Sequence, residues 1–257
     1  MRVRAILMSF VMISVLVFAL EAQQSAGRDP QALTVLQNSF RAMGGILPTD
    51  AVVTGTVTIV AGSKTDNGTI RILARGLEQY AEEIQTSDGF KREAYSKGIG
   101  AETEGTSRKE KSLEWTANGD LAGAPIHVVA AALAMPDLAV EYIGLEQENA
   151  VALHHLRVWD TYASRPKLQS LSRFSVKDLW VDTITGFLRR LSFERREAGG
   201  AVDGIGIVVF YSDYRDVGGT FYPFHIEKSL NGTPWLTIQI EKIAFNTGLS
   251  ESDFSIH

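Results

Sequence analysis

A long series of short segments in which apolar and polar residues alternate constrains the fold of this chain more than any other feature. The series begins near residue 51, and segments such as "VVTGTVTIVA" (52–61) and "GTIRILARG" (68–76) are separated by Gly, Asn and Asp turn residues. A period of two residues is typical of β-strands with one buried face. The pattern predicts about 11 sequential antiparallel strands, which stack as a sandwich or curl towards a barrel.

A first helix is predicted before this series. Asp29 and Pro30 form a typical helix start, and Gly44-Gly45 a typical end. The apolar residues between them recur at three- and four-residue spacing: Leu33, Leu36, Phe40 and Met43. This N-terminal helix is therefore amphipathic, and we expect it to lie on the core.

A second helix interrupts the strands at residues 123–137, "GAPIHVVAAALAMPD". Pro125 can begin it and Pro136 ends it, and almost no polar face lies between them. A helix that is apolar all round must be buried or lie in a groove. We expect a lid against the concave side of the sheet, formed by Ile126, Val129, Leu133 and Met135.

The strands also carry a surplus of large apolar side chains at alternating positions. A curved sheet lined by such residues and closed by a movable helix would enclose an apolar cavity suited to a lipid. The candidate lining residues are Trp115, Tyr142, Trp180, Phe210, Phe224 and Ile238. The predicted fold class is α+β, mainly β: a large curved antiparallel sheet, or unclosed β-barrel, covered by the two helices.

Composition narrows the possible partners. The 257 residues are 45% apolar and 21% charged, with a net charge of −5 and no cysteine. The mild acidity argues against a nucleic-acid partner, because phosphate binding needs a concentrated positive field. Without cysteine there is no disulfide, thiolate metal site or lipid-modified N-terminal cysteine.

The N-terminus predicts export. Arg2 and Arg4 precede an uncharged apolar run, Ala5 to Leu20, that is shorter than the roughly 20 residues of a membrane-spanning helix. We expect residues 1–22 to be a cleaved signal peptide, with an uncleaved membrane anchor as the alternative. Residues 23–257 then form a single domain in the periplasm.

Catalytic patterns are sparse. The adjacent His154 and His155 are expected to point to opposite faces of a strand and cannot both bind one metal without a bulge. Asp213 and Asp216 are better explained as turn caps and ion pairs, Asp182 opens a turn, and the run "RKEK" (108–111) is a solvated segment. We assign no catalytic residue, no metal and no cofactor.

Two hairpins resemble those of the bacterial lipoprotein-carrier superfamily of LolA/LolB-like proteins. "LWVDTITGFLRRLSFE" is similar to a strand–turn–strand segment of that family. "YSDYRDVGGTFYPFHIE" is similar to the end of the family's domain. The matching positions in the second segment are Tyr214, Gly219, Pro223 and Ile226. The resemblance implies an unclosed barrel covered by helices, with a hydrophobic cavity that accepts acyl chains.

Three functions follow as hypotheses. The first is a monomeric periplasmic carrier that binds a lipid or the acyl chains of a lipoprotein. The second is a scaffold or envelope-stress sensor of the same fold, which binds an envelope protein and no stable ligand. The third is a hydrolase, which no motif supports.

Overall fold

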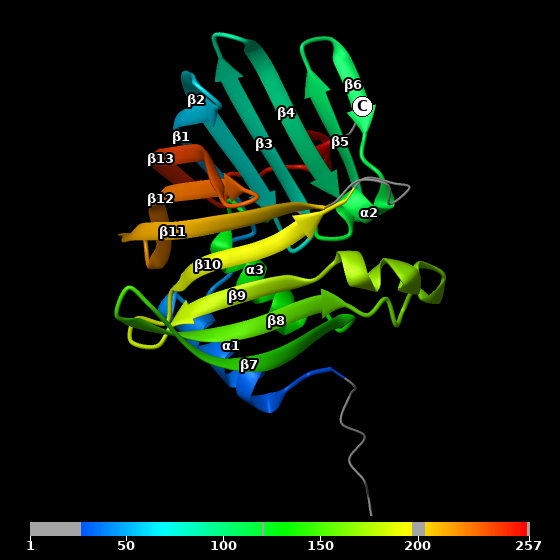
Figure 1. Cartoon of the computed structure of the whole chain (residues 1–257), viewed down its shortest axis with the longest axis vertical. Coiled ribbons are helices and arrows are strands. Elements are labelled where there is room, and N and C mark those ends of the chain that lie inside the picture. The colour runs from blue at the N-terminus through cyan, green and yellow to red at the C-terminus, as the bar shows by residue number, and fades with distance from the viewer. Residues whose placement is uncertain (1–26, 120, 197–203, 256–257) are drawn as a thin grey trace, which may run out of the picture.

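The structure, a computed structural model, describes residues 27–119, 121–196 and 204–255 (Figure 1). Within these residues, thirteen strands form one sheet in the order β6-β5-β4-β3-β2-β1-β13-β12-β11-β10-β9-β8-β7. The strands are β1 (Asp50–Ala61), β2 (Lys64–Arg75), β3 (Gln79–Thr86), β4 (Gly89–Ser96), β5 (Ile99–Glu104), β6 (Ser107–Glu110), β7 (Leu138–Glu148), β8 (Val151–Asp160), β9 (Lys177–Asp182), β10 (Leu188–Arg195), β11 (Ile205–Val217), β12 (Thr220–Leu230) and β13 (Thr233–Phe245). The helices are α1 (Pro30–Ala42), α2 (Leu113–Thr116) and α3 (Pro125–Ala134), with the 3-10 helices η1 (Pro166–Phe174) and η2 (Glu251–Phe254).

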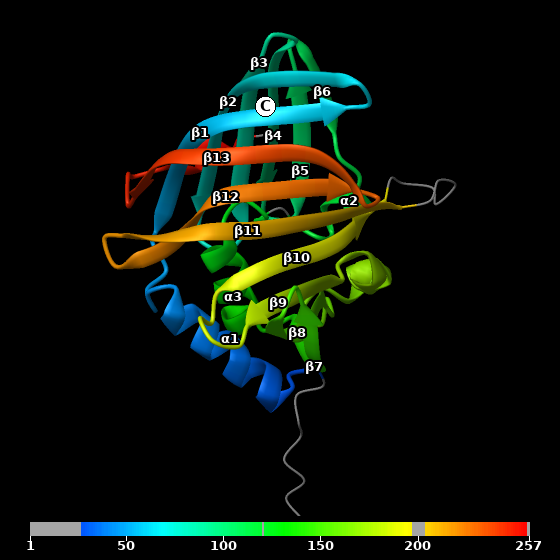
Figure 2. The same cartoon turned by 60° about the vertical axis from the view of Figure 1, so that its left-hand side comes forward.

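The sheet is antiparallel throughout and open. Every hydrogen-bonded pair of strands is antiparallel, and the edge strands β6 and β7 do not pair with each other. The strands β3 to β6 run in a clearly different direction from β7 to β10, and α1 and α3 lie on the inner side of this bend (Figures 1 and 2). The predicted curved, unclosed antiparallel sheet with two covering helices is confirmed.

Two local elements could not be expected from the alternating pattern. Residues 99–104 form β5, although the segment holds few large apolar residues. The segment 108–119 contains the last three residues of β6 and then the short helix α2. The side chain of Ser112 begins α2 by accepting a hydrogen bond from the backbone N–H of Trp115 (3.2 Å).

The N-terminal helix begins and ends as predicted. The carboxylate of Asp29 accepts hydrogen bonds from the backbone N–H groups of Gln31 (2.7 Å) and Ala32 (3.2 Å), and Pro30 occupies the first turn. Leu36 and Met43 are completely buried, so the apolar side of α1 covers the core. Both Gly44 and Gly45 have positive φ angles, as a helix-ending glycine requires.

No helix among the described residues is long and apolar enough to cross a membrane. The predicted signal peptide, residues 1–22, lies outside the described residues.

Candidate functional site

The helix α3 fills one half of the concave face. Its residues from Pro125 to Ala132 are buried, and Ile126 and Val129 belong to the main hydrophobic core. The helix packs against α1 and β7. A helix with almost no polar face is stable only in such a position, because rotating it about its axis would expose apolar side chains to water.

Two tyrosines hold the chain just before α3. The hydroxyl of Tyr211 on β11 donates to the carbonyl of Ala122 (2.6 Å), and that of Tyr222 on β12 donates to the carbonyl of Gly123. A Cβ at Gly123 would lie 2.5 Å from the hydroxyl oxygen of Tyr80, so a larger residue there would require the Tyr80 side chain to shift. Burial raises the pKa of Tyr222 well above its ordinary value, so this hydroxyl stays a donor.

Arg28 holds the other end of α3. Its guanidinium donates to the carbonyls of Ala132 (3.0 Å) and Leu133 (2.8 Å), and to those of Met135 and Leu138 (both 3.0 Å). The last carbonyls of a helix have no partner within the helix and carry its negative dipole end. One forked cation therefore satisfies the end of α3 and joins it to the segment before α1. Sequence reasoning missed this contact, which spans more than 100 residues.

His127 is a polar residue inside this helix. Its side chain is fully buried, and neither ring nitrogen has a hydrogen-bond partner among the described residues. Burial lowers the pKa of the imidazole to about 4, which the charge of Asp50 only partly offsets. His127 is therefore neutral at pH 7.

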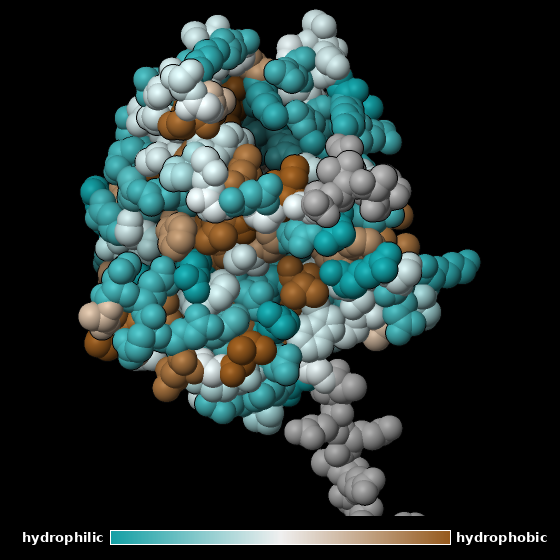
Figure 3. All heavy atoms as spheres, viewed as in Figure 1, coloured by the Kyte–Doolittle hydropathy of each residue, from teal (hydrophilic) through white to brown (hydrophobic). Residues whose placement is uncertain are grey.

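The other half of the concave face is hollow. A cavity of about 550 Å³, called the larger cavity below, lies between β2 to β5 and β10 to β13. Its volume is in the range of small-molecule sites, roughly 300–1,000 Å³. Figure 3 shows this side of the molecule hollowed between the upper strands, with hydrophobic residues gathered near the opening. Apolar lining residues include Ile84, Phe90, Trp115, Phe193, Ile207 and Trp235.

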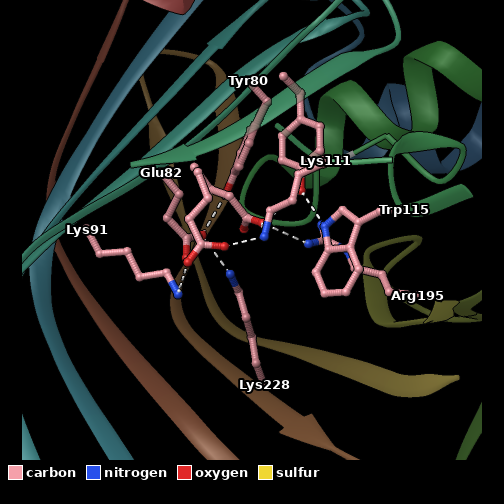
Figure 4. Close-up of polar contacts among 10 residues, drawn as sticks. Tyr80, Glu82, Lys91, Lys111, Trp115, Arg195 and Lys228 are labelled. Carbon is pink, nitrogen blue, oxygen red and sulfur yellow. Dashed lines mark hydrogen bonds and ion pairs between the residues drawn. The ribbon is translucent and has the colours of Figure 1, made fainter. Parts of the chain in front are cut away.

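Seven charged residues also line the larger cavity and form one charged cluster: Glu82, Lys91, Glu93, Glu102, Lys111, Arg195 and Lys228 (Figure 4). Lys228 pairs with Glu82 (2.6 Å), and Arg195 pairs with Glu93 (3.2 Å). Lys91 (2.7 Å) and Lys111 both pair with Glu102. The side chains of Lys111, Arg195 and Lys228 are only 7%, 5% and 7% exposed.

The pairs with Lys91 and Lys111 keep the carboxylate of Glu102 ionised. Burial by itself would raise the pKa of Glu102, but hydrogen bonds from Lys111 and Lys91 outweigh it and lower the pKa to about 2. The prediction that residues 108–111 are solvated is therefore wrong for Lys111. Its ammonium lies inside the molecule, 4.5 Å from the ring centroid of Trp115. In the sequence, the nearby Trp115 is the signal that could have indicated the burial of Lys111.

A smaller cavity of about 140 Å³ lies beside α3 and η1. Val128 and Met135 line it from the helix side, and Tyr80 and Tyr95 from the sheet. Glu82 and Glu93, each two residues from one of these tyrosines on the same strand, line the larger cavity. The two cavities are therefore neighbours on one concave face, with α2 contributing to both.

The six predicted lining residues do not come together. Trp115 lines the larger cavity, whereas Ile238 is fully buried in the main core and Phe224 packs against that core. Tyr142 also packs against the core, and its hydroxyl contacts Nδ1 of His154 (3.1 Å).

Trp180 and Phe210 lie on the opposite, outer face. Their strand neighbours Leu179 and Val209 are fully buried in the core, and successive side chains of a strand alternate between faces. Both residues line a surface pocket together with Arg190, whose guanidinium lies 3.7 Å from the Trp180 ring centroid. The prediction that these two residues line the concave cavity is corrected by this placement.

The four predicted lid residues do lie together. Ile126 and Val129 are fully buried, Leu133 is half-buried against the core, and Met135 follows the end of α3 and lines the smaller cavity. They lie on the concave face of the sheet. That α3 can leave this position stays a prediction.

The residues considered for catalysis have structural partners. His155 stacks on Trp180 (4.3 Å between centroids) and contacts Asp178 (3.0 Å), while the carboxylate of Asp182 accepts from the N–H groups of the following turn. Asp213 pairs with Arg215 (2.5 Å) at the surface. Among the described residues, no group of three or more His, Cys, Asp and Glu side chains could hold a metal ion.

Comparison with solved structures identifies the architecture. The chain is similar to a domain described as outer membrane lipoprotein-sorting from Vibrio parahaemolyticus, with 11% identity, a TM-score of 0.58, and coverage of 88% of this chain and 96% of that one. It is also similar to a LolA superfamily protein from Nitrosomonas europaea (14% identity, TM-score 0.56, coverage 87% and 97%). A DUF1329 family protein from Desulfovibrio piger gives 11% identity, a TM-score of 0.55 and coverage of 87% and 97%.

The chain has a LolA-like fold. The resemblance inferred from its two hairpins is confirmed at this level. No protein-family model and no curated protein matches the sequence. At such low identity the LolA-like fold is what the neighbours share with this chain, and function must be argued from its own cavity.

Proposed function

We propose that this protein is a periplasmic carrier that shields a lipid, or the acyl chains of a lipoprotein, inside the larger cavity. The observation that carries the proposal is a hollow of about 550 Å³ in the concave face, next to a buried apolar helix whose two ends are hydrogen-bonded to Arg28 and, through the preceding residues, to Tyr211. Burying an acyl chain is favourable by about 0.8 kcal/mol per methylene. The LolA-like fold and the lipoprotein-sorting description of the Vibrio domain support the same function.

In this proposal binding is physical shielding, without a catalytic step. The acyl chain enters the larger cavity past Phe90 and Trp235, and α3 is the movable lid whose departure would extend the hollow along the sheet. Arg28 and the hydroxyls of Tyr211 and Tyr222 return α3 to its place on release. Residues 1–22 are the cleaved signal peptide, and residues 23–257 act as a monomeric domain.

Native mass spectrometry of gently purified protein tests the proposal. We expect a co-purified lipid in the wild type and less of it in Ile207→Trp, because Ile207 lines the larger cavity and an indole there would narrow it. The matched control is Val208→Trp, since Val208 is the next residue on β11 and lines the outer pocket. Loss of lipid in both variants would contradict the assigned cavity.

Tryptophan emission gives a second test. Trp115 and Trp235 line the larger cavity, whereas Trp180 lies on the outer face. Added fatty acid should shift the emission of the wild type and of Trp180→Phe, and the shift should shrink in Trp115→Phe and Trp235→Phe. A protein that carries no lipid and shows no shift is not a carrier, and the scaffold hypothesis, with an envelope protein as partner, would replace this one.

A further inference from the structure

The smaller cavity beside α3 is lined mainly by apolar side chains. Val128 and Met135 contribute from the helix side, and Val158, Leu171 and Leu179 are among the residues that line the rest. The volume of this cavity is about 140 Å³. An apolar cavity of roughly 150 Å³ stays free of water and binds benzene. The smaller cavity therefore has room for one apolar group of about that size.

Several polar side chains around the smaller cavity already have partners. The hydroxyl of Tyr95 donates to the carboxylate of Glu93 (2.9 Å), and Asp160 forms an ion pair with Arg165 (2.9 Å). The hydroxyl of Ser175 donates to a backbone carbonyl of η1 (2.7 Å). These groups are satisfied by the protein itself and do not require a ligand.

Asn118 differs from these residues. It is only 1% exposed and lines the cavity, and its amide nitrogen donates to the backbone carbonyl of Glu194 (2.6 Å). Its amide oxygen is buried and has no hydrogen-bond partner among the described residues. A buried acceptor without a donor is unfavourable, and such groups are rare in folded proteins. A buried water usually makes about three hydrogen bonds, which a mainly apolar wall does not offer.

We infer that the smaller cavity is a second ligand site, which binds a small uncharged molecule with an apolar body the size of a benzene ring and one hydroxyl group. The hydroxyl donates to the amide oxygen of Asn118, and the apolar body packs against α3 and η1. The inference goes beyond the carrier function, because this site is separate from the larger cavity and too small for a whole lipid. Since α3 forms one side of the site, a bound molecule also stabilises the docked position of the helix.

The test uses toluene and phenol, which share a ring and differ in a methyl or a hydroxyl group. Isothermal titration calorimetry measures their binding to the wild type, and we expect both to bind. Asn118→Leu should weaken the binding of phenol about 10-fold and leave that of toluene unchanged, because leucine has a similar size but no acceptor. Each probe is compared with itself, so the different hydration of the two probes cancels.

Filling the cavity should weaken the binding of both probes. Met135 is half-buried and lines the cavity just after the end of α3, so Met135→Trp places an indole at this site. We expect a loss of at least about 10-fold for toluene and for phenol. The matched control is Ala134→Trp, at an exposed neighbour that does not line the cavity, and it should bind both probes as the wild type does.

Amide hydrogen exchange of the wild type gives a test that needs no substitution. Bound phenol should slow the exchange of residues 126–134, because the molecule binds only while α3 is docked. Phenol that binds without this protection would occupy another place.

Each outcome supports or overturns a defined part of the inference. No binding of either probe, or binding that Met135→Trp leaves unchanged, would overturn the second site. Equal effects of Asn118→Leu on toluene and phenol would overturn the role of Asn118 and the requirement for a hydroxyl group. None of these results decides the carrier function, whose tests follow lipid in the larger cavity.

Discussion

The two halves of the concave face differ in what covers the sheet. In one half α3 covers the sheet with fully buried apolar side chains such as Ile126 and Val129. In the other half the sheet leaves a hollow of about 550 Å³ that contains ion pairs such as Lys228–Glu82. A chain that only needed a stable core would fill both halves, because an unfilled cavity lowers stability. This difference supports the proposal that the second half binds a ligand.

Breaking the filled half should have the largest effect. Ile126→Asp places a carboxylate where Ile126 is completely buried, and we expect it to lower the free energy of unfolding by about 4 kcal/mol or more. Urea unfolding followed by circular dichroism measures it. Ala134→Asp at the exposed end of the same helix is the control, with an expected loss below about 1 kcal/mol. Similar small losses of stability in both variants would show that α3 is not tightly packed against the sheet.

Removing the contact at the end of α3 should have the next largest effect. Arg28→Met deprives four carbonyls of their donor, and we expect a loss of about 2–3 kcal/mol. Amide hydrogen exchange should accelerate in residues 126–134 more than in the strands. Arg28→Lys should recover only part of the loss, because an ammonium cannot fork between carbonyls as a guanidinium does. Arg41→Met, at an exposed residue of α1, is the control; an equal effect there would refute the special role of Arg28.

The hydroxyl contact before α3 should matter less. Tyr222→Phe leaves the ring in place but removes the donor to the buried carbonyl of Gly123, at an expected cost of about 1–2 kcal/mol. Thermal unfolding at neutral pH checks this value. An unchanged stability would mean that the ring, and not the hydroxyl, positions this segment.

Acid should weaken the filled half gradually. The pKa of His127 is about 4 in the folded protein, below its ordinary value of 6.5, so the unfolded chain binds this proton first as the pH falls. The contribution of neutral His127 to stability is complete above about pH 6.5 and is lost towards pH 4, by at most about 1.4 kcal/mol per pH unit. The free energy of unfolding, measured from pH 8 to pH 4, should fall more steeply in the wild type than in His127→Phe. Parallel curves would exclude His127 as the titrating group.

Much of the filled half could be predicted from the sequence. The prolines at 125 and 136 and the lack of polar residues between them define α3, and Asp29-Pro30 defines the start of α1. These are local signals, because a cap, a proline or an apolar run acts within a few residues. The alternating segments likewise predict most strands and their antiparallel order.

The open half could not be predicted in the same way. Alternation shows that two faces differ, but it does not tell which one is concave when both carry large apolar residues. Trp180 was therefore assigned to the wrong face. The ion pair between Lys228 and Glu82 joins residues 146 positions apart. In the sequence alone, neither residue can be distinguished from an ordinary surface charge. Only the curvature of the sheet brings them together.

Hydrogen exchange of α3 in the presence and absence of bound dodecanoate tests the central claim most directly. If the concave face is one lipid site with α3 as its lid, the amides of residues 126–134 should exchange about 10-fold faster in the bound protein, while those of β10 to β13 exchange more slowly. Bound dodecanoate with unchanged or slower exchange in α3 would contradict the account, because the helix would then be a fixed part of the core.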